Sequence, residues 1–185
     1  MSVRCVCFAK KYSLPVFASQ GTLNALRDKM EETEMHTMEQ GIQIADMEVG
    51  YFCTSHDCAE PIGFRIQTAD DRTVVIATDL GYISDEVEHS LLGADFTVIE
   101  SNHDEKMLKE GPYPYYLKKR ILSDEGHLSN RACAAMLPRL AQSGTTRFLL
   151  THLSRENNTP SAARNLSLKA LTACGLTENQ DFLLS

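Results

Sequence analysis

Three short stretches decide the fold of this chain: VVIATD at 74–79, TVIESNHD at 97–104 and FLLTHLS at 148–154. Each begins with an apolar or β-branched run that is long enough for a buried strand but short for a helix. Polar residues that can bind metal or transfer protons follow each run: Asp79 after the first, Glu100, Asn102, His103 and Asp104 after the second, and Thr151 and His152 after the third. Buried strands that end in carboxylates and imidazoles build a site at one edge of an α/β sheet. The sequence therefore predicts an α/β fold with a metal-assisted hydrolytic site.

The composition is that of an ordinary globular protein, with 43% apolar and 23% charged residues. We expect one domain spanning residues 1–185, because this length buries a substantial core. The formal charge of −7 argues against broad attraction to nucleic acid, although 118–120 is a basic cluster. No signal peptide or long apolar run is evident, so we expect a cytoplasmic protein without a membrane segment. The oligomeric state stays open.

The six cysteines show no C-x-x-C spacing, so we expect reduced and mostly buried thiols. Cys58, two residues after His56, is the thiol to examine as a neighbour of a metal.

Strands and helices alternate along most of the chain. We expect a helix end and short strand within 2–19, helices at 21–30, 84–92, 130–142 and 161–174, strands within 42–54 and at 96–101, 147–154 and 181–185, a hairpin of 62–68 with 72–78, and an aromatic loop or short helices at 106–120. Pro138 should shorten or kink its helix. Hairpins followed by alternating strands and helices favour an α/β sandwich in which helices cover a mixed sheet. No G-x-G-x-x-G or P-loop follows a strand, which disfavours a doubly wound nucleotide-binding fold.

Four side chains are candidates for chemistry, and three of them have a plainer alternative. His56, in TSHD, is a metal ligand that Asp57 would orient, or a solvated loop histidine. Asp79 bridges two cations or caps a turn. His152 ends an apolar strand, where an imidazole needs a partner such as a metal. His127, just before a helix, is a general acid or a surface histidine.

The phrases SHD, ATDLGY, ESNHD, KRILSDEGHLSN and HLSRENN together resemble the metallo-β-lactamase superfamily, specifically its bacterial WalJ (YycJ)-type members. The resemblance runs from about residue 5 to about residue 160. It implies the αββα sandwich of that superfamily and a metal-dependent hydrolase of the phosphodiesterase or DNA exonuclease type.

The resemblance also implies roles for individual residues. His56 would bind a first Zn²⁺ or Mn²⁺ ion, Asp79 would bridge two ions, and His152 would bind the second. His127 would be the extra histidine that nucleases of the superfamily place near the scissile phosphate. Glu100 would be the carboxylate that supports His127.

The superfamily signature H-x-H-x-D-H, which supplies two ligands to each metal, is absent from the sequence. The other histidines, at 36, 89 and 103, do not have its spacing. We therefore expect an N-terminally incomplete sandwich that lacks half of the metal ligands. Three functions stay open: a metal-dependent phosphodiesterase or nuclease, an inactive remnant that acts as a structural or binding partner, and an α/β domain whose histidines are coincidental.

One further segment has two interpretations. Tyr113, Tyr115 and Tyr116 precede the basic cluster at 118–120 and could stack on and clamp a nucleic-acid strand. The same aromatic residues could instead pack as a lid.

Overall fold

The computed structural model describes residues 3–30, 33–38 and 41–185. In chain order the elements are α1 (Val3–Tyr12), β1 (Val16–Ala18), α2 (Gln20–Leu26) with a 3-10 turn (Arg27–Lys29), β2 (Met35–Thr37), β3 (Ile42–Ile44), β4 (Met47–Cys53), β5 (Ile62–Gln67), β6 (Thr73–Ala77), α3 (Asp85–Leu91), β7 (Phe96–Glu100), α4 (Glu105–Glu110), α5 (Tyr115–Ile121), α6 (Asn130–Gln142), β8 (Arg147–Thr151), α7 (Pro160–Ala173) and β9 (Leu183–Leu184). Strands β1 and β2 form a small parallel pair, and β3 to β9 form one larger sheet in chain order.

The larger sheet changes direction in its middle. Strands β3 to β6 pair antiparallel, and the predicted hairpin of β5 and β6 is confirmed. Strands β6 to β9 pair parallel, joined by crossovers that contain helices. The three stretches that decide the fold become the neighbouring strands β6, β7 and β8. Because these strands are parallel, the polar residues that follow them meet at one edge of the sheet.

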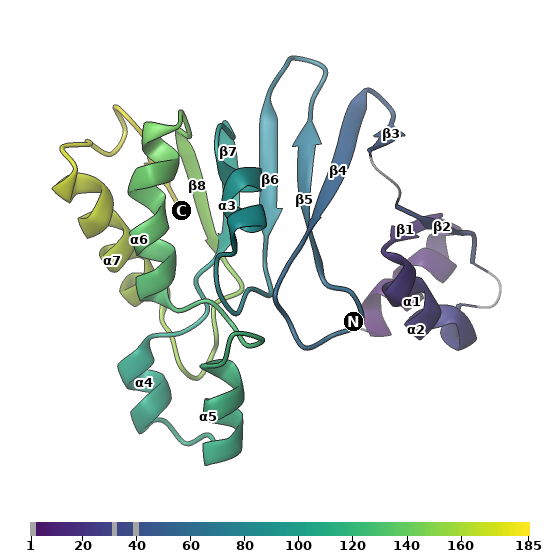
Figure 1. Ribbon diagram of the computed structural model, residues 1–185, viewed down its shortest axis with the longest axis horizontal. Coiled ribbons are helices and arrows are strands. Elements are labelled where there is room, and N and C mark those ends of the chain that lie inside the picture. The colour runs from purple at the N-terminus through teal and green to yellow at the C-terminus, as the bar shows by residue number, and fades with distance from the viewer. Residues whose placement is uncertain (1–2, 31–32, 39–40) are drawn as a thin grey trace.

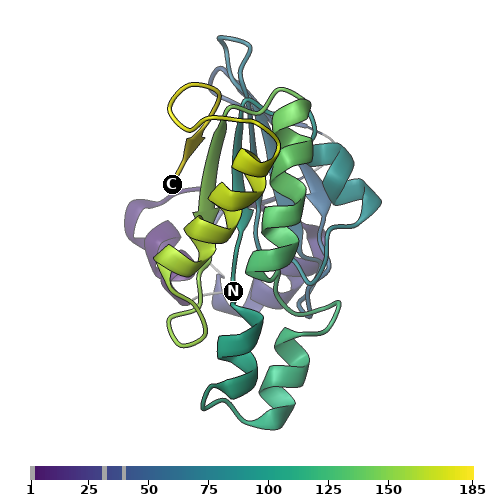
Figure 2. The same cartoon turned by 90° about the vertical axis from the view of Figure 1, so that its left-hand side faces the viewer.

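Helices α3, α6 and α7 cover one face of this sheet (Figures 1 and 2). Side chains alternate between the two faces of a strand, so every second residue points at these helices. Val75 and Ile99 are fully buried there, and Phe148 is nearly so. On the opposite face Val98 is half-buried and Leu149 is 36% exposed. The predicted α/β fold is confirmed, and its core lies on the helix-covered face.

Two expectations about local structure need correction. Pro138 does not shorten its helix: α6 spans the full predicted range of 130–142, and buried residues such as Leu137 and Leu140 hold it against the sheet. The cysteines are not mostly buried: of the five whose side chains are described, only Cys133 is buried, and all five are free thiols.

Two parts of the chain lie outside the sheet and its helical layer. The N-terminal elements α1, α2, β1 and β2 gather beyond β4, at the far end from α7, whereas α4 and α5 project together away from the body (Figures 1 and 2). The expected aromatic loop or short helices at 106–120 are thus two short helices. Within the described ranges, no helix combines the length and apolar character needed to cross a bilayer.

Candidate metal centre

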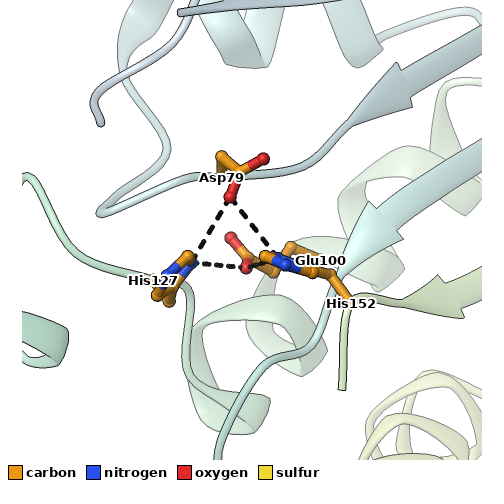
Figure 3. A group of neighbouring side chains, drawn as sticks. All are labelled: Asp79, Glu100, His127 and His152. Atoms are coloured by element: carbon orange, nitrogen blue, oxygen red, sulfur yellow. Dashed lines mark hydrogen bonds and ion pairs between the residues drawn. The ribbon is translucent and has the colours of Figure 1, made fainter. Parts of the chain in front are cut away.

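Four predicted site residues converge where the parallel strands end (Figure 3). Asp79 follows β6, Glu100 is the last residue of β7, and His152 follows β8, whereas His127 enters from the loop before α6. One ligand atom from each of these four residues lies within 4.8 Å of the others. The described residues therefore contain a group that could hold a metal ion.

Glu100 is the buried centre of this group, with no exposed surface. Its Oε1 accepts hydrogen bonds from Nδ1 of His127 at 2.8 Å and from Nδ1 of His152 at 2.6 Å. Its Oε2 accepts from the backbone N–H groups of Leu80 at 2.7 Å and Leu128 at 3.3 Å. Because an ionised carboxylate only accepts, we assign the hydrogen of each neutral ring to Nδ1. That tautomer leaves the Nε2 lone pairs available to a cation.

Electrostatics favour the ionised form of this carboxyl group. Burial alone raises the pKa of Glu100, but hydrogen bonds from His127, His152 and the Leu80 N–H outweigh it and hold the pKa below its ordinary value. The hydrogen bond to Glu100 raises the pKa of His152 against the opposing effect of burial, with further help from the charge of Asp79. Glu100 thus holds two imidazoles in fixed orientations.

Asp79 and His152 adopt a backbone conformation that side chains usually avoid. Their φ angles are 56° and 55°, in the left-handed region. For an L-residue this region costs about 1–2 kcal/mol relative to the right-handed one. Strained residues of this kind cluster at functional sites, where the surrounding structure holds them in place. Both side chains are 44% exposed, so they face solvent and are accessible to a ligand.

His56 lies at the margin of the group. Its Nδ1 faces the carbonyl oxygen of Gly126 at 3.0 Å, and its Nε2 is 3.7 Å from Oδ1 of Asp79. The Gly126 carbonyl oxygen thus faces one ring nitrogen, and Oδ1 of Asp57 lies 3.5 Å from the other, Nε2. Asp57 forms a bidentate pair with Arg120, and these hydrogen bonds lower the pKa of Asp57. The sequence carried no signal for this pair, since the two residues are far apart along the chain.

A buried amide network fixes the loops that carry the site. Asn158 donates to the carbonyl oxygens of Ser101 and Asn102 at 2.8 and 2.9 Å. Asn130 donates to Asn158 at 2.8 Å, and Asn102 donates to the carbonyl oxygen of His152 at 2.8 Å. These bonds account for Asn102 in the phrase ESNHD and for Asn158 in the phrase HLSRENN, and they help to hold the left-handed turn at His152.

His103, although it belongs to one of these phrases, is not a member of the group. It is 1% exposed, and neither of its ring nitrogens has a hydrogen-bond partner among the described residues. Burial lowers the pKa of His103, so the neutral imidazole is favoured.

A cavity of about 400 Å³ opens beside the site, between the N-terminal elements and the sheet. Its lining includes His56, Asp79, Cys58, Phe17 and Phe64. Cys58 is therefore a neighbour of the candidate ligands, as the sequence suggested, but burial raises the pKa of its thiol, with a further increase from Asp79. The thiol form of Cys58 is thereby favoured, which is the poorer ligand.

The donor set suits a transition metal. Imidazole nitrogens and a carboxylate are the ligands of hydrolytic zinc sites, which keep one position open for water. Anchoring of Nδ1 by a carboxylate is the usual outer-shell arrangement around such histidines. Asp79, His127 and His152 offer ligand atoms within 4.8 Å of one another and could therefore share one ion, with Glu100 behind the two rings.

Comparison with known proteins agrees with the fold. The family model described as a beta-lactamase superfamily domain matches residues 1–153. Exodeoxyribonuclease WalJ of Streptococcus pneumoniae is 35% identical over 181 residues, covering 94% of this chain and 67% of the relative. Exodeoxyribonuclease YycJ of Bacillus anthracis is 37% identical over 161 residues, covering 84% of this chain and 61% of the relative. The chain thus spans about two thirds of the length of these relatives.

Solved structures show the same fold. The metallo-β-lactamase fold protein YhfI of Bacillus subtilis superposes with a TM-score of 0.59 at 18% identity, covering 89% of this chain and 64% of that one. Zinc-bound PqqB of Methylobacterium extorquens superposes with a TM-score of 0.66 at 14% identity, covering 97% and 65%. The chain belongs to the metallo-β-lactamase superfamily of hydrolases. Within that superfamily it is a protein of the WalJ (YycJ) type.

Proposed function

We propose that this chain acts as a metal-dependent phosphodiesterase that removes nucleotides from a DNA end. The observation that carries the proposal is the convergence of Asp79, His127 and His152 around the buried carboxylate of Glu100. The exodeoxyribonuclease names of the relatives from S. pneumoniae and B. anthracis support DNA as the substrate.

In this proposal His56, Asp79 and His152 hold one or two ions of Zn²⁺ or Mn²⁺. When bound, an ion of this kind would act as a Lewis acid and lower the pKa of its bound water toward neutrality. Oδ1 of Asp79 lies between two imidazoles, 3.7 Å from Nε2 of His56 and 3.6 Å from Nδ1 of His152. We assign Asp79 as the bridging carboxylate on this position between the two rings.

His127 is proposed as the general acid. As an imidazolium it would donate its Nε2 proton to the oxygen that leaves when the P–O bond breaks, while Nδ1–H stays bonded to Glu100. The buried carboxylate would stabilise the positive ring. His127 and His152 share the same oxygen of Glu100, so geometry alone makes His127 a possible ligand as well, and metal content separates the two roles.

A second candidate function is a structural or DNA-binding partner without hydrolysis. One observation favours it: the sequence contains no H-x-H-x-D-H. His56, Asp79 and His152 would then be only about half of the metal ligands that the resemblance implies.

The test uses the purified 185-residue chain. We expect bound zinc or manganese by elemental analysis, and metal-stimulated release of nucleotides from end-labelled DNA that EDTA abolishes. His152→Ala should lose both, whereas His89→Ala, an exposed histidine on α3, should lose neither. Metal binding without any release would favour the second function, and absence of both would overturn the proposed site.

A further inference from the structure

The helices α4 and α5 and the turn between them form a projecting arm, residues 105–121 (Figures 1 and 2). The arm contains five basic and two acidic residues, within a chain whose formal charge is −7. The five basic and two acidic residues give the arm a formal charge of +3, which has the sign that attracts an anionic polymer.

Two aromatic rings stand on the surface of the arm. Tyr115 is 81% exposed and Tyr116 is 74% exposed, the two largest values among the exposed large hydrophobic residues that the structure describes. Tyr113, by contrast, is half-buried. Neighbouring cations are also accessible: Lys106 and Lys119 are exposed and make no ion pair with any described residue. Rings as exposed as those of Tyr115 and Tyr116 do not pack against the body, which disfavours the interpretation of this segment as a closed lid.

The base of the arm is attached to the site itself. Arg120 pairs with Asp57, the neighbour of His56. The carbonyl oxygen of Ile121 accepts a hydrogen bond from the backbone N–H of His127 at 3.0 Å. Because Arg120 neutralises Asp57, it also removes one negative charge from the path of a phosphate. The Arg120–Asp57 pair and this backbone hydrogen bond thus fix the position of the arm relative to the site.

The tip is stiffened by its own contacts. Lys118 Nζ donates to the carbonyl oxygen of Lys109 at 2.7 Å, which ties α5 to α4. A Cβ at Gly111 would lie 2.7 Å from the Met107 carbonyl oxygen and 2.8 Å from Oδ1 of Asn157, so the turn needs glycine for its close approach to the body. A rigid arm loses little entropy when it binds a ligand.

We propose that the arm binds a single-stranded segment of nucleic acid that leads into the site, with bases stacked on Tyr115 and Tyr116 and phosphates near Lys106 and Lys119. This inference rests on the proposed function and names how that substrate is held. Aromatic rings accept the face of any base, and lysines accept phosphate without regard to sequence. At 1.5 Å per residue, the seven residues of α5 rise about 10 Å, the length of about three nucleotides stacked 3.4 Å apart.

The experiment measures binding without hydrolysis. Fluorescence anisotropy with a labelled twelve-nucleotide thymidine oligomer is recorded in EDTA, so that no cleavage occurs. The variant Tyr115→Ala/Tyr116→Ala should weaken binding at least about 10-fold, because each stacked base contributes strongly. Tyr115→Phe/Tyr116→Phe should restore it, since stacking needs the ring and not the hydroxyl. Tyr12→Ala, a 53% exposed tyrosine on α1, is the matched control.

The contribution of the two lysines is tested separately, through the dependence of oligomer binding on salt concentration. Lys106→Gln and Lys119→Gln should each reduce the slope of log K against log salt by about 0.7, the value for one phosphate contact on a single strand. The control Lys169→Gln, an exposed lysine on α7, should leave the slope unchanged.

Each result has one meaning. Unchanged DNA binding by the double alanine variant overturns the inference, as does a wild-type chain that binds no oligomer in EDTA. A change in self-association by light scattering, with DNA binding intact, also overturns it and identifies a protein contact. The proposed function is judged independently, by metal content and release of nucleotides, so the arm can fail while the metal centre stands.

Discussion

Replacing Glu100 with glutamine tests the central claim about the site. The carboxylate of Glu100 accepts four hydrogen bonds, two from imidazoles on one oxygen and two from backbone N–H groups on the other. Glutamine has one acceptor oxygen and one NH₂ group, and NH₂ can only donate. In either orientation of the glutamine side chain, its NH₂ group faces two hydrogen-bond donors, and these two donors have no acceptor.

The magnitude depends on which donors are lost. If NH₂ faces the backbone of Leu80 and Leu128, two buried N–H groups lose their partner at about 1–3 kcal/mol each, so unfolding becomes easier by about 2–6 kcal/mol. If NH₂ faces His127 and His152, the rings can accept only by moving their hydrogen to Nε2. In that tautomer Nε2 has no lone pair to bind metal, so the affinity of the site for metal should fall about 10–100-fold.

Both quantities are measured on one preparation. Urea unfolding in EDTA gives the free energy of unfolding, and titration with Zn²⁺ or Mn²⁺ gives the affinity. Glu48→Gln, an exposed glutamate on β4, provides the same change of charge and should alter neither quantity. Glu100→Gln that retained wild-type stability and wild-type affinity together would refute the assigned hydrogen bonds, and with them the account of how the imidazoles are held.

Three further outcomes follow from the structure. Asp79→Ala and His152→Ala should lose metal and nucleotide release, whereas His127→Ala should slow release with metal content near that of the wild type; equal metal loss in all three, by elemental analysis, would make His127 a ligand rather than the acid. Asp79→Gly should be about 1–2 kcal/mol more stable than Asp79→Ala by urea unfolding in EDTA, because glycine adopts φ of 56° without strain; equal stability of the two would show that the turn relaxes. The pKa of His103 lies below its ordinary value, so the unfolded chain binds a proton that the folded chain does not as pH falls through and below about 6.5. His103 should therefore lower the stability in EDTA by up to about 1.4 kcal/mol for each unit that the pH falls, whereas the raised pKa of His152 acts in the opposite direction. His103→Leu should remove the His103 contribution, and a pH curve parallel to that of the wild type would rule this contribution out.

The sequence predicted the elements better than the contacts between them. The strands around 74–79, 97–104 and 148–154 follow from their apolar runs, and helices α3 and α6 begin after Ser84 and Ser129, a residue type that commonly caps helices. Such features depend on neighbouring residues, which is why they can be derived locally.

The details of the site depend on contacts between distant segments, and the sequence could not supply them. The resemblance assigned Glu100 to His127 alone, but the carboxylate also holds His152, 52 residues away. The pair of Asp57 with Arg120 and the burial of His103 arise only when separate elements pack together.

The left-handed turns at Asp79 and His152 have a consequence for the evolution of this protein. With glycine or asparagine at these two positions, the folded protein would have a lower free energy. Substitutions to these residues should therefore accumulate once hydrolysis of the substrate no longer requires Asp79 and His152. A lineage that had ceased to hydrolyse its substrate should therefore drift toward those residues at these two codons first. Related genes can be sorted by this criterion before any of their products is purified.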